Sequence, residues 1–240
     1  MTKILKHPTA QAAAAAAAVR IAAIIDDLSR KQDRISLAVS GGSTPKLLFK
    51  ELVKQHVDWA TLHLFWVDER AVPQTDDQSN YKLAKEYLLD SLKYPRPTVH
   101  RIPAELRPRQ AADAYAEDIA AYFRLEPGAI AQFDIVQLGI GDDAHTASLF
   151  PGEPLIADYA SNVKAIKVEQ KMQWRITLMP AVIQKAKYRI VLAAGPDKAQ
   201  PLFDILNTAF DPMTYPAQII VDTQGPTEWF LDEAAAALLD

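Results

Sequence analysis

The sequence predicts an α/β fold in which helices cover both faces of a mostly parallel β-sheet. Short apolar runs typical of buried strands alternate along the 240-residue chain with segments whose apolar residues recur at helical spacing. Glycine is scarce, with 8 residues against 16 prolines, and Gly41 and Gly42, like Gly139 and Gly141, directly follow a predicted strand. Because glycine serves positions that need unusual backbone geometry, we expect both pairs to mark tight turns at the edge of the sheet.

The first elements follow one another as helix, strand, helix and strand. Residues 9–30 are rich in alanine and predict a helix, and the apolar residues 35–39 (ISLAV) predict a buried strand that leads into Ser-Gly-Gly. We expect Thr44 to cap the second helix, with Pro45 at its first position. The apolar run LHLFWV at 62–67 predicts the second strand.

The rest of the chain continues this alternation. Strands are expected over residues 99–102, 133–138, 188–194, 218–221 and 229–231, and helices over 78–92, 110–123, 198–206 and 233–239. Residues 163–168 and 174–179 alternate between apolar and polar and predict an inserted antiparallel hairpin that turns around residues 170–172. With no internal repeat and no dividing linker, we expect a single domain over residues 1–240.

The composition argues against several functional classes. A net charge of −4 without a dense tract of lysine or arginine disfavours a nucleic-acid partner. The absence of cysteine excludes disulfides, thiolate zinc sites and cysteine nucleophiles. The alanine-rich run at 12–19 loosely resembles a signal peptide, but Arg20 interrupts it, and no stretch approaches the roughly 18 apolar residues of a membrane span. We therefore expect a cytoplasmic protein without membrane association.

In open α/β sheets, ligands bind beyond the carboxyl ends of the strands. The first such segment contains Gly41, Gly42, Ser43 and Thr44, where glycines allow close backbone approach and hydroxyls accompany a helix N-terminus. These features suit a phosphate, although a plain strand–turn–helix connection would have the same residues. The segment is not a Walker loop, because no Gly-Lys-Ser/Thr follows at the required spacing.

Three charged residues, Asp68, Glu69 and Arg70, follow the second strand. A carboxylate pair beside an arginine can hold sugar hydroxyls or anions and can tune the pKa of a neighbouring group. A surface salt bridge is the alternative interpretation. Ser79 and Asn80 open the next predicted helix, where either residue caps the helix or Asn80 donates to a substrate.

The segment after the third strand carries the candidate base, His145. Residues 139–144 match the pattern G-x-G-x-x-A of dinucleotide-binding turns, but Asp142 and Asp143 would repel a pyrophosphate, so we reject that interpretation. We expect a tight turn that presents His145 at a helix start, with Asp143 or a more distant carboxylate orienting its ring. Asp143 and His145 are also metal-ligand types, but no second histidine lies nearby, so no metal is expected.

Two cationic residues complete the candidate site. Arg175 lies inside an apolar strand, where burial is costly without an anionic partner. Lys198 follows Gly195 at a strand end. Each alone is also explained as an ordinary surface charge, but together with the glycine loop they would form a phosphate clamp.

Several blocks of the sequence resemble the glucosamine-6-phosphate isomerase/6-phosphogluconolactonase family, and they occur in the family's order. They are VSGGSTP at 39–45, WVDERAVP at 66–73, SNY at 79–81, LGIGDDAHTASLFPG at 138–152, RITL at 175–178 and GPDKA at 195–199. The resemblance implies a three-layer α/β/α fold with a Rossmann-like sheet. It also implies hydrolysis of 6-phospho-D-glucono-1,5-lactone to 6-phospho-D-gluconate, the second step of the oxidative pentose phosphate pathway.

The resemblance also implies roles for individual residues. His145 matches the general base, whereas Asp68 and Arg70 match an acid–arginine motif at the sugar end. The phosphate-binding positions match Arg175, Lys198 and the loop 41–44. The family usually has glycine where this chain has Ala144, so a positive φ there would cost about 1 kcal/mol.

The implied partner is a small sugar-phosphate lactone, with no nucleic acid, membrane, metal or cofactor. The protein is expected to be a monomer or a homodimer. Two alternative functions remain open at this point: an amino-sugar-phosphate deaminase/isomerase and a non-catalytic sugar-phosphate sensor.

Overall fold

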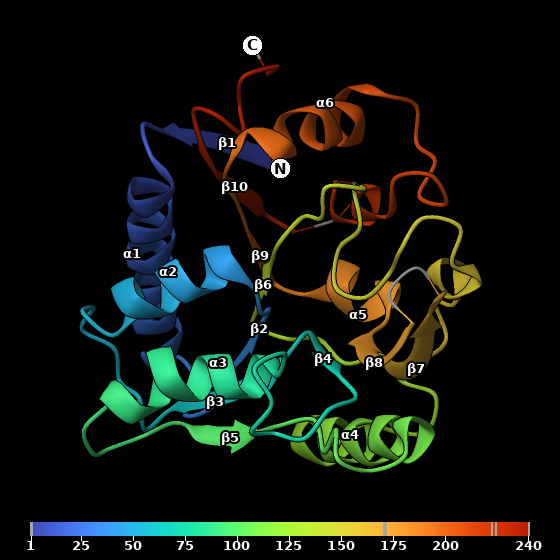
Figure 1. Cartoon of the computed structure of the whole chain (residues 1–240). Coiled ribbons are helices and arrows are strands. Elements are labelled where there is room, and N and C mark those ends of the chain that lie inside the picture. Colours follow the sequence, from blue (N-terminus) through green and yellow to red (C-terminus); the bar gives the residue numbers. More distant parts are fainter. Residues whose placement is uncertain (1, 170–171, 222, 224, 240) are drawn as a thin grey trace.

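A seven-stranded parallel sheet forms the centre of the protein in a computed structural model that describes residues 2–169, 172–221, 223 and 225–239 (Figure 1). The order of its strands is β1-β10-β9-β6-β2-β3-β5, and every neighbouring pair is parallel. The strands are β1 (Thr2–His7), β2 (Ile35–Val39), β3 (Leu62–Trp66), β5 (Thr98–His100), β6 (Ile135–Leu138), β9 (Tyr188–Ala193) and β10 (Thr227–Asp232). The predicted α/β class with a mostly parallel sheet is confirmed.

A second, three-stranded sheet has the order β4-β8-β7 and is antiparallel. Its strands are β4 (Asp68–Arg70), β7 (Val163–Val168) and β8 (Gln173–Leu178). Both strands of the predicted hairpin are therefore confirmed, whereas residues 170 and 171 of its predicted turn lie outside the described residues. The sequence did not predict β4, because its three charged residues carry no apolar pattern.

Helices cover both faces of the main sheet. They are α1 (Ala10–Ser29), α2 (Ser43–Leu52), α3 (Asn80–Tyr87), α4 (Pro108–Phe123), α5 (Pro180–Lys185) and α6 (Ala199–Asn207). Successive side chains of a strand point to opposite faces, and β3 shows the consequence. Trp66 packs on Tyr81 of α3, whereas Phe65 packs on Tyr115 and Tyr122 of α4. The fold is thus a three-layer α/β/α arrangement, and none of its described helices is long and apolar enough to cross a membrane.

The sequence missed one element and misassigned two others near the termini of the chain. The edge strand β1 was not expected, because most of its residues are exposed and it lacks a buried apolar alternation. Residues 218–221 are not a strand; a 3-10 helix over Pro216–Ile220 buries that apolar run instead. The helix expected over 233–239 is a series of turns, in which the Asp232 carboxylate accepts a hydrogen bond from Ala235 N at 2.8 Å.

The chain changes direction across the sheet between β2 and β6. From β2 it proceeds to β3 and β5 on one side, and from β6 it proceeds to β9 and β10 on the other. Directly after β2, Ser40 N donates to Oε1 of Gln137 in β6 at 3.1 Å, and Ser40 Oγ donates to the Gln137 carbonyl at 3.0 Å. Such a switch point leaves a crevice at the carboxyl ends of the strands, where ligands bind in open α/β sheets.

Candidate active site

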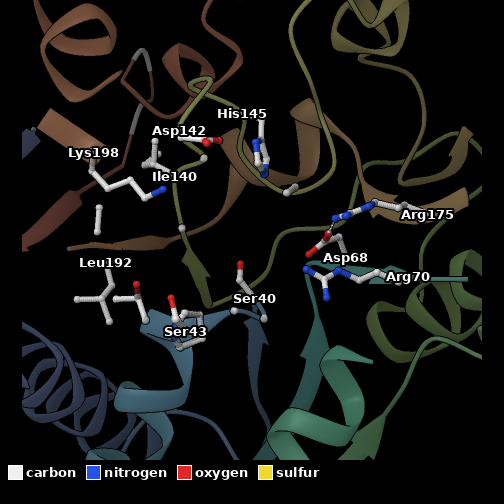
Figure 2. Close-up of a pocket in the computed structure, with 18 residues that line it drawn as sticks. Ser40, Ser43, Asp68, Arg70, Ile140, Asp142, His145, Arg175, Leu192 and Lys198 are labelled. Atoms are coloured by element: carbon white, nitrogen blue, oxygen red, sulfur yellow. Dashed lines mark ion pairs between the residues drawn. The ribbon is translucent and has the colours of Figure 1, made fainter. Parts of the chain in front are cut away.

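A cleft of about 290 Å³ opens at this switch point. Its lining comprises Ser40, Gly41, Gly42, Ser43, Thr44, Pro45, Asp68, Arg70, Gly139, Ile140, Gly141, Asp142, His145, Ala147, Arg175, Leu192, Ala193 and Lys198 (Figure 2). The structure therefore brings together all of the predicted site residues except Asp143. They come from strands β4 and β8 of the second sheet and from the three segments that follow β2, β6 and β9.

The N-terminus of α2 forms one wall of the cleft. Gly42 caps this helix with a φ of 118°, so the prediction of Thr44 as N-cap is wrong and Ser43 is the first helical residue. The first backbone N–H groups of a helix have no acceptor inside it, which makes them available to an anion. A Cβ on Gly41 would lie 1.8 Å from Asn80 Oδ1, so this position requires glycine because the α3 residue approaches its backbone.

His145 projects into the cleft from the loop after β6 (Figure 2). A compact turn holds this loop, with Gly141 N donating to the His145 carbonyl at 2.8 Å. A Cβ on Gly141 would lie 1.9 Å from His145 Nδ1, which explains the glycine at this place. No helix begins here, so the expected helix start is wrong: turns and an isolated bridge between Thr146 and Leu149 follow instead.

Asp143 orients the ring of His145. Its Oδ1 lies 2.5 Å from His145 Nδ1 and also accepts the His145 backbone N–H at 3.0 Å. Burial raises the pKa of Asp143, but the hydrogen bonds and charge of His145 lower it further, so the net pKa lies below its ordinary value. An ionised Asp143 fixes the proton of a neutral imidazole on Nδ1 and leaves the lone pair on Nε2. Asp143 itself does not line the cleft, whereas Asp142 does.

Ala144 has a φ of 65°, in the left-handed region that glycine adopts without strain. The sequence identified this position as a departure from the family pattern, and the backbone keeps the glycine-like conformation. The expected strain is about 1 kcal/mol. The turn therefore presents His145 despite the alanine, at a cost to stability.

Asp68 is a buried carboxylate at the opposite wall. Ser148 Oγ donates to its Oδ2 at 2.6 Å, and Asn80 Nδ2 donates to its carbonyl at 2.9 Å and to its Oδ1 at 3.3 Å. Asn80 thus supports Asp68 and does not line the cleft, so its suggested donation to a substrate is not supported. Arg175 Nη1 lies 3.8 Å from Asp68 Oδ2.

Glu69 serves the fold and not the cleft. Its carboxylate accepts the backbone N–H groups of Arg70, Asn80 and Tyr81, each at 2.8 Å, and the hydroxyl of Ser79 at 3.0 Å. Burial raises the pKa of Glu69, although these four hydrogen bonds oppose the shift. Glu69 therefore caps the start of α3, which leaves Asp68 as the carboxylate of this motif that faces the cleft.

Arg70 and Arg175 form a cationic pair at the same wall. They are register partners in the antiparallel pairing of β4 and β8, and neither Nε atom has a hydrogen-bond partner among the described residues. Burial lowers the pKa of Arg175, Asp68 raises it and Arg70 lowers it, with a net shift downward. Two neighbouring guanidinium groups with free buried donors form a site for an anion.

Lys198 reaches the cleft from the loop after β9. Figure 2 shows it on the opposite side from Arg175, with His145 between them, so the two cations do not form one compact cluster. The Lys198 ammonium lies 2.7 Å from the Asp197 carboxylate. The cleft therefore offers positive charge at two ends, one beside the α2 N-terminus and one at sheet β4-β8-β7.

Two residues at the site were not identified from the sequence. Ser148 holds Asp68, and the Phe150 ring stacks on the His145 imidazole with a centroid distance of 4.1 Å and an interplanar angle of 25°. Both lie in the long block around His145, but no spacing rule predicts their contacts. Within the described part of the chain, no group of three or more histidine, aspartate and glutamate side chains is arranged to hold a metal ion.

Comparisons with known proteins identify a family, related sequences and a similar fold. Residues 8–229 match the model of the family described as glucosamine-6-phosphate isomerases/6-phosphogluconolactonase. The chain is 38% identical to a 6-phosphogluconolactonase of Synechocystis over 202 residues, covering 83% of this chain and 82% of the relative. It is also 38% identical to a 6-phosphogluconolactonase of Haemophilus influenzae over 209 residues, covering 85% of this chain and 88% of the relative. The solved 6-phosphogluconolactonase of Trypanosoma brucei superimposes with a TM-score of 0.88 at 30% identity, covering 100% of this chain and 99% of that chain.

Proposed function

The chain belongs to the glucosamine-6-phosphate isomerase/6-phosphogluconolactonase family, and we propose that it hydrolyses 6-phospho-D-glucono-1,5-lactone to 6-phospho-D-gluconate. This reaction is the second step of the oxidative pentose phosphate pathway. The observation that carries the proposal is the Asp143–His145 pair in a cleft bordered by positive charge at both ends. A base between two anion-binding regions suits a substrate that carries a phosphate at one end and an ester carbonyl at the other.

We assign the phosphate to the N-terminus of α2. Backbone N–H groups of residues 41–44 would bind its oxygens, with Lys198 approaching from one side, while Arg175 lies beside Arg70 at the other end of the cleft. These contacts would be equally strong in the ground state and the transition state, so they do not stabilise the transition state selectively. Their contribution is to orient the substrate, with its lactone carbonyl within reach of His145. The Asp68 carboxylate lies 3.8 Å from Arg175 Nη1. It would accept hydrogen bonds from hydroxyl groups of the sugar.

His145 acts as the general base in this proposal. Asp143 keeps the proton of the neutral imidazole on Nδ1, so Nε2 accepts a proton from water while the water oxygen attacks the lactone carbonyl carbon. The resulting tetrahedral intermediate collapses when the bond from that carbon to the ring oxygen breaks. The imidazolium returns its proton to the departing ring oxygen, which becomes a hydroxyl group of the product.

Arg70 is assigned to the developing oxyanion. Its Nη1 donates to the Gln78 carbonyl at 2.6 Å, which fixes the guanidinium, while its buried Nε is free to donate. A donor that is already in place where negative charge develops lowers the barrier without reorganisation. Asp68 and Arg70 therefore belong to the reacting end of the cleft.

A coupled assay on freshly prepared lactone, corrected for spontaneous hydrolysis, tests the function. Wild-type protein is expected to accelerate hydrolysis, and His145→Asn is expected to lower kcat by about 10²- to 10⁴-fold. Retention of the wild-type rate by His145→Asn would exclude His145 as the base. Ammonia release from glucosamine 6-phosphate, measured in parallel, distinguishes the deaminase activity that the family description also includes.

A further inference from the structure

We propose that Phe150 is a positioning residue that fixes the plane of the His145 imidazole and supports the Arg175 guanidinium. The inference rests on the proposed function, because it assigns a role within the same reaction. Phe150 is 3% exposed and is absent from the residues that line the cleft. Its contribution would be made through the two residues on which it packs.

The first contact is with the candidate base. The rings of Phe150 and His145 are stacked, with centroids 4.1 Å apart and planes 25° from parallel. The Asp143 carboxylate holds Nδ1 alone, and one hydrogen bond leaves the imidazole free to tilt about that atom. A flat surface against one face of the ring removes this freedom. Phe150 and Asp143 together therefore determine where Nε2 points.

The second contact is with the cationic wall. The Cζ atom of Arg175 lies 5.6 Å from the centre of the Phe150 ring, within the range of a cation–π interaction. Arg175 has a distant partner in Asp68, at 3.8 Å, and its Nε has no hydrogen-bond partner in the described structure. The aromatic surface therefore supplies the guanidinium with a second contact besides the Asp68 carboxylate.

Phe150 belongs to a small apolar cluster that is separate from the main core. It consists of Phe150, Ile166 and Val168, with Leu155 packed against it. Ile166 is the register partner of Arg175 in the β7–β8 pairing, so the two side chains share one face of the sheet. Sheet β4-β8-β7 therefore carries the cationic pair and also anchors the ring that packs on the base.

Phe150→Leu tests the inference because leucine keeps an apolar side chain in the cluster but removes the flat ring. We expect kcat for lactone hydrolysis to fall by about 10- to 100-fold, since small displacements of a catalytic group have effects of this size. Val168→Ala is the matched control: it weakens the same cluster, but Val168 pairs with Gln173 and not with a residue of the site. We expect its kcat and KM to stay within about twofold of wild type.

Urea unfolding of both variants measures how much each weakens the fold, so that a loss of kcat specific to Phe150→Leu cannot be ascribed to stability. The imidazole proton resonances of His145, assigned with His145→Asn, give a readout that does not depend on turnover. Loss of the stacked ring is expected to move them downfield in Phe150→Leu and to leave them unchanged in Val168→Ala.

The outcomes separate this inference from the proposed function. A wild-type protein without lactonase activity would contradict the proposed function, while the resonance shift would still test the stacking. An active wild type whose kcat falls equally in Phe150→Leu and Val168→Ala, or does not fall in either, would overturn the positioning role. A large loss of kcat in Phe150→Leu alone, with the shifted resonance, would establish it.

Discussion

Arg70 lies directly opposite Arg175 in the antiparallel pairing of β4 and β8. Like charges at directly opposed positions destabilise a sheet, and the Asp68 carboxylate compensates only at 3.8 Å from Arg175. Repulsion within the pair is therefore expected to lower the stability of the unliganded protein, and a bound anion would reduce this repulsion. Both arginines line the cleft, where a bound anion would face the two guanidinium groups.

Arg70→Gln is expected to relieve the repulsion while it impairs the site. The free energy of unfolding without ligand should stay unchanged or rise by up to about 1 kcal/mol, whereas the stabilisation by added 6-phosphogluconate should decrease. Thermal unfolding with and without 6-phosphogluconate measures both quantities. Arg30→Gln, which removes an exposed ion pair with Asp26, is the control and should change neither. Undiminished stabilisation by the ligand in Arg70→Gln would contradict the assignment.

Gly141→Ala is expected to displace the candidate base without unfolding the protein. The added methyl group would lie 1.9 Å from His145 Nδ1 and 2.7 Å from Asp143 Oδ1, so the contact between these side chains must break. We expect lactonase kcat to fall by about 100-fold. Gly139→Ala, in the same loop, has no atom within 4 Å of its added Cβ and should lose much less activity. Equal losses in both variants would show that the clash does not determine the effect.

Ala144→Gly is expected to stabilise the protein, contrary to the usual effect of glycine. Its φ of 65° strains alanine, and glycine removes this strain at the cost of a more flexible unfolded chain. The net gain should be up to about 1 kcal/mol in urea unfolding, with lactonase activity retained. Ala116→Gly inside α4 should instead cost about 1 kcal/mol, as glycine does within a helix. A loss of stability in both variants would mean that the turn is not strained.

His63 should make the stability of the protein depend on pH. Burial, together with Arg34 and His100, lowers its pKa to about 4, although Asp118 opposes this shift. Because the unfolded chain takes up the proton near pH 6.5 and the folded protein does not, stability should fall as the pH decreases from about 6.5 to about 4. Urea unfolding at pH 7 and pH 5 should show a smaller difference in His63→Gln than in wild type.

The exposed His56 supplies the control for this pH dependence. His56→Gln should preserve the wild-type difference between the two pH values. If His63→Gln also preserved it, the pH dependence would have to come from other groups. His63 Nδ1 forms a hydrogen bond of 2.9 Å with His100 Nε2, as donor or as acceptor. Glutamine is the suitable replacement for His63 because its amide group can serve in either role.

The sequence predicted the loops that form the site better than it predicted the residues that hold the site side chains in place. Strands with continuous or alternating apolar residues, such as β2 and β7, have the predicted bounds, because burial of their faces dictates that pattern. The glycine turns line the cleft as expected, and among the charged residues after the strands so do Asp68, Arg70 and Asp142, whereas Glu69 and Asp143 do not. These features depend on local backbone geometry, which local sequence determines.

The features that the sequence did not predict depend on contacts between distant parts of the chain. The stacking of Phe150 on His145, the support of Asp68 by Ser148 and the pairing of β4 with β8 all require the tertiary structure. The sequence left open whether Asp143 or a more distant carboxylate orients the His145 ring and whether Asp143 also faces the cleft; the side chain of Asp143 holds His145 and does not line the cleft. Side-chain orientation within a tight turn decides between these two roles, and residue order alone does not specify it.

The hydrogen bond between Ser148 and Asp68 joins residues that are 80 positions apart, and it lies under the reacting end of the cleft. Closing a loop of that length costs chain entropy, so such contacts form late in folding. The Arg70–Arg175 pair can bind an anion only after β4 has paired with β8. During refolding, catalytic activity should therefore return after the helical circular dichroism signal has recovered. The return of turnover would then report when the contact between Ser148 and Asp68 forms.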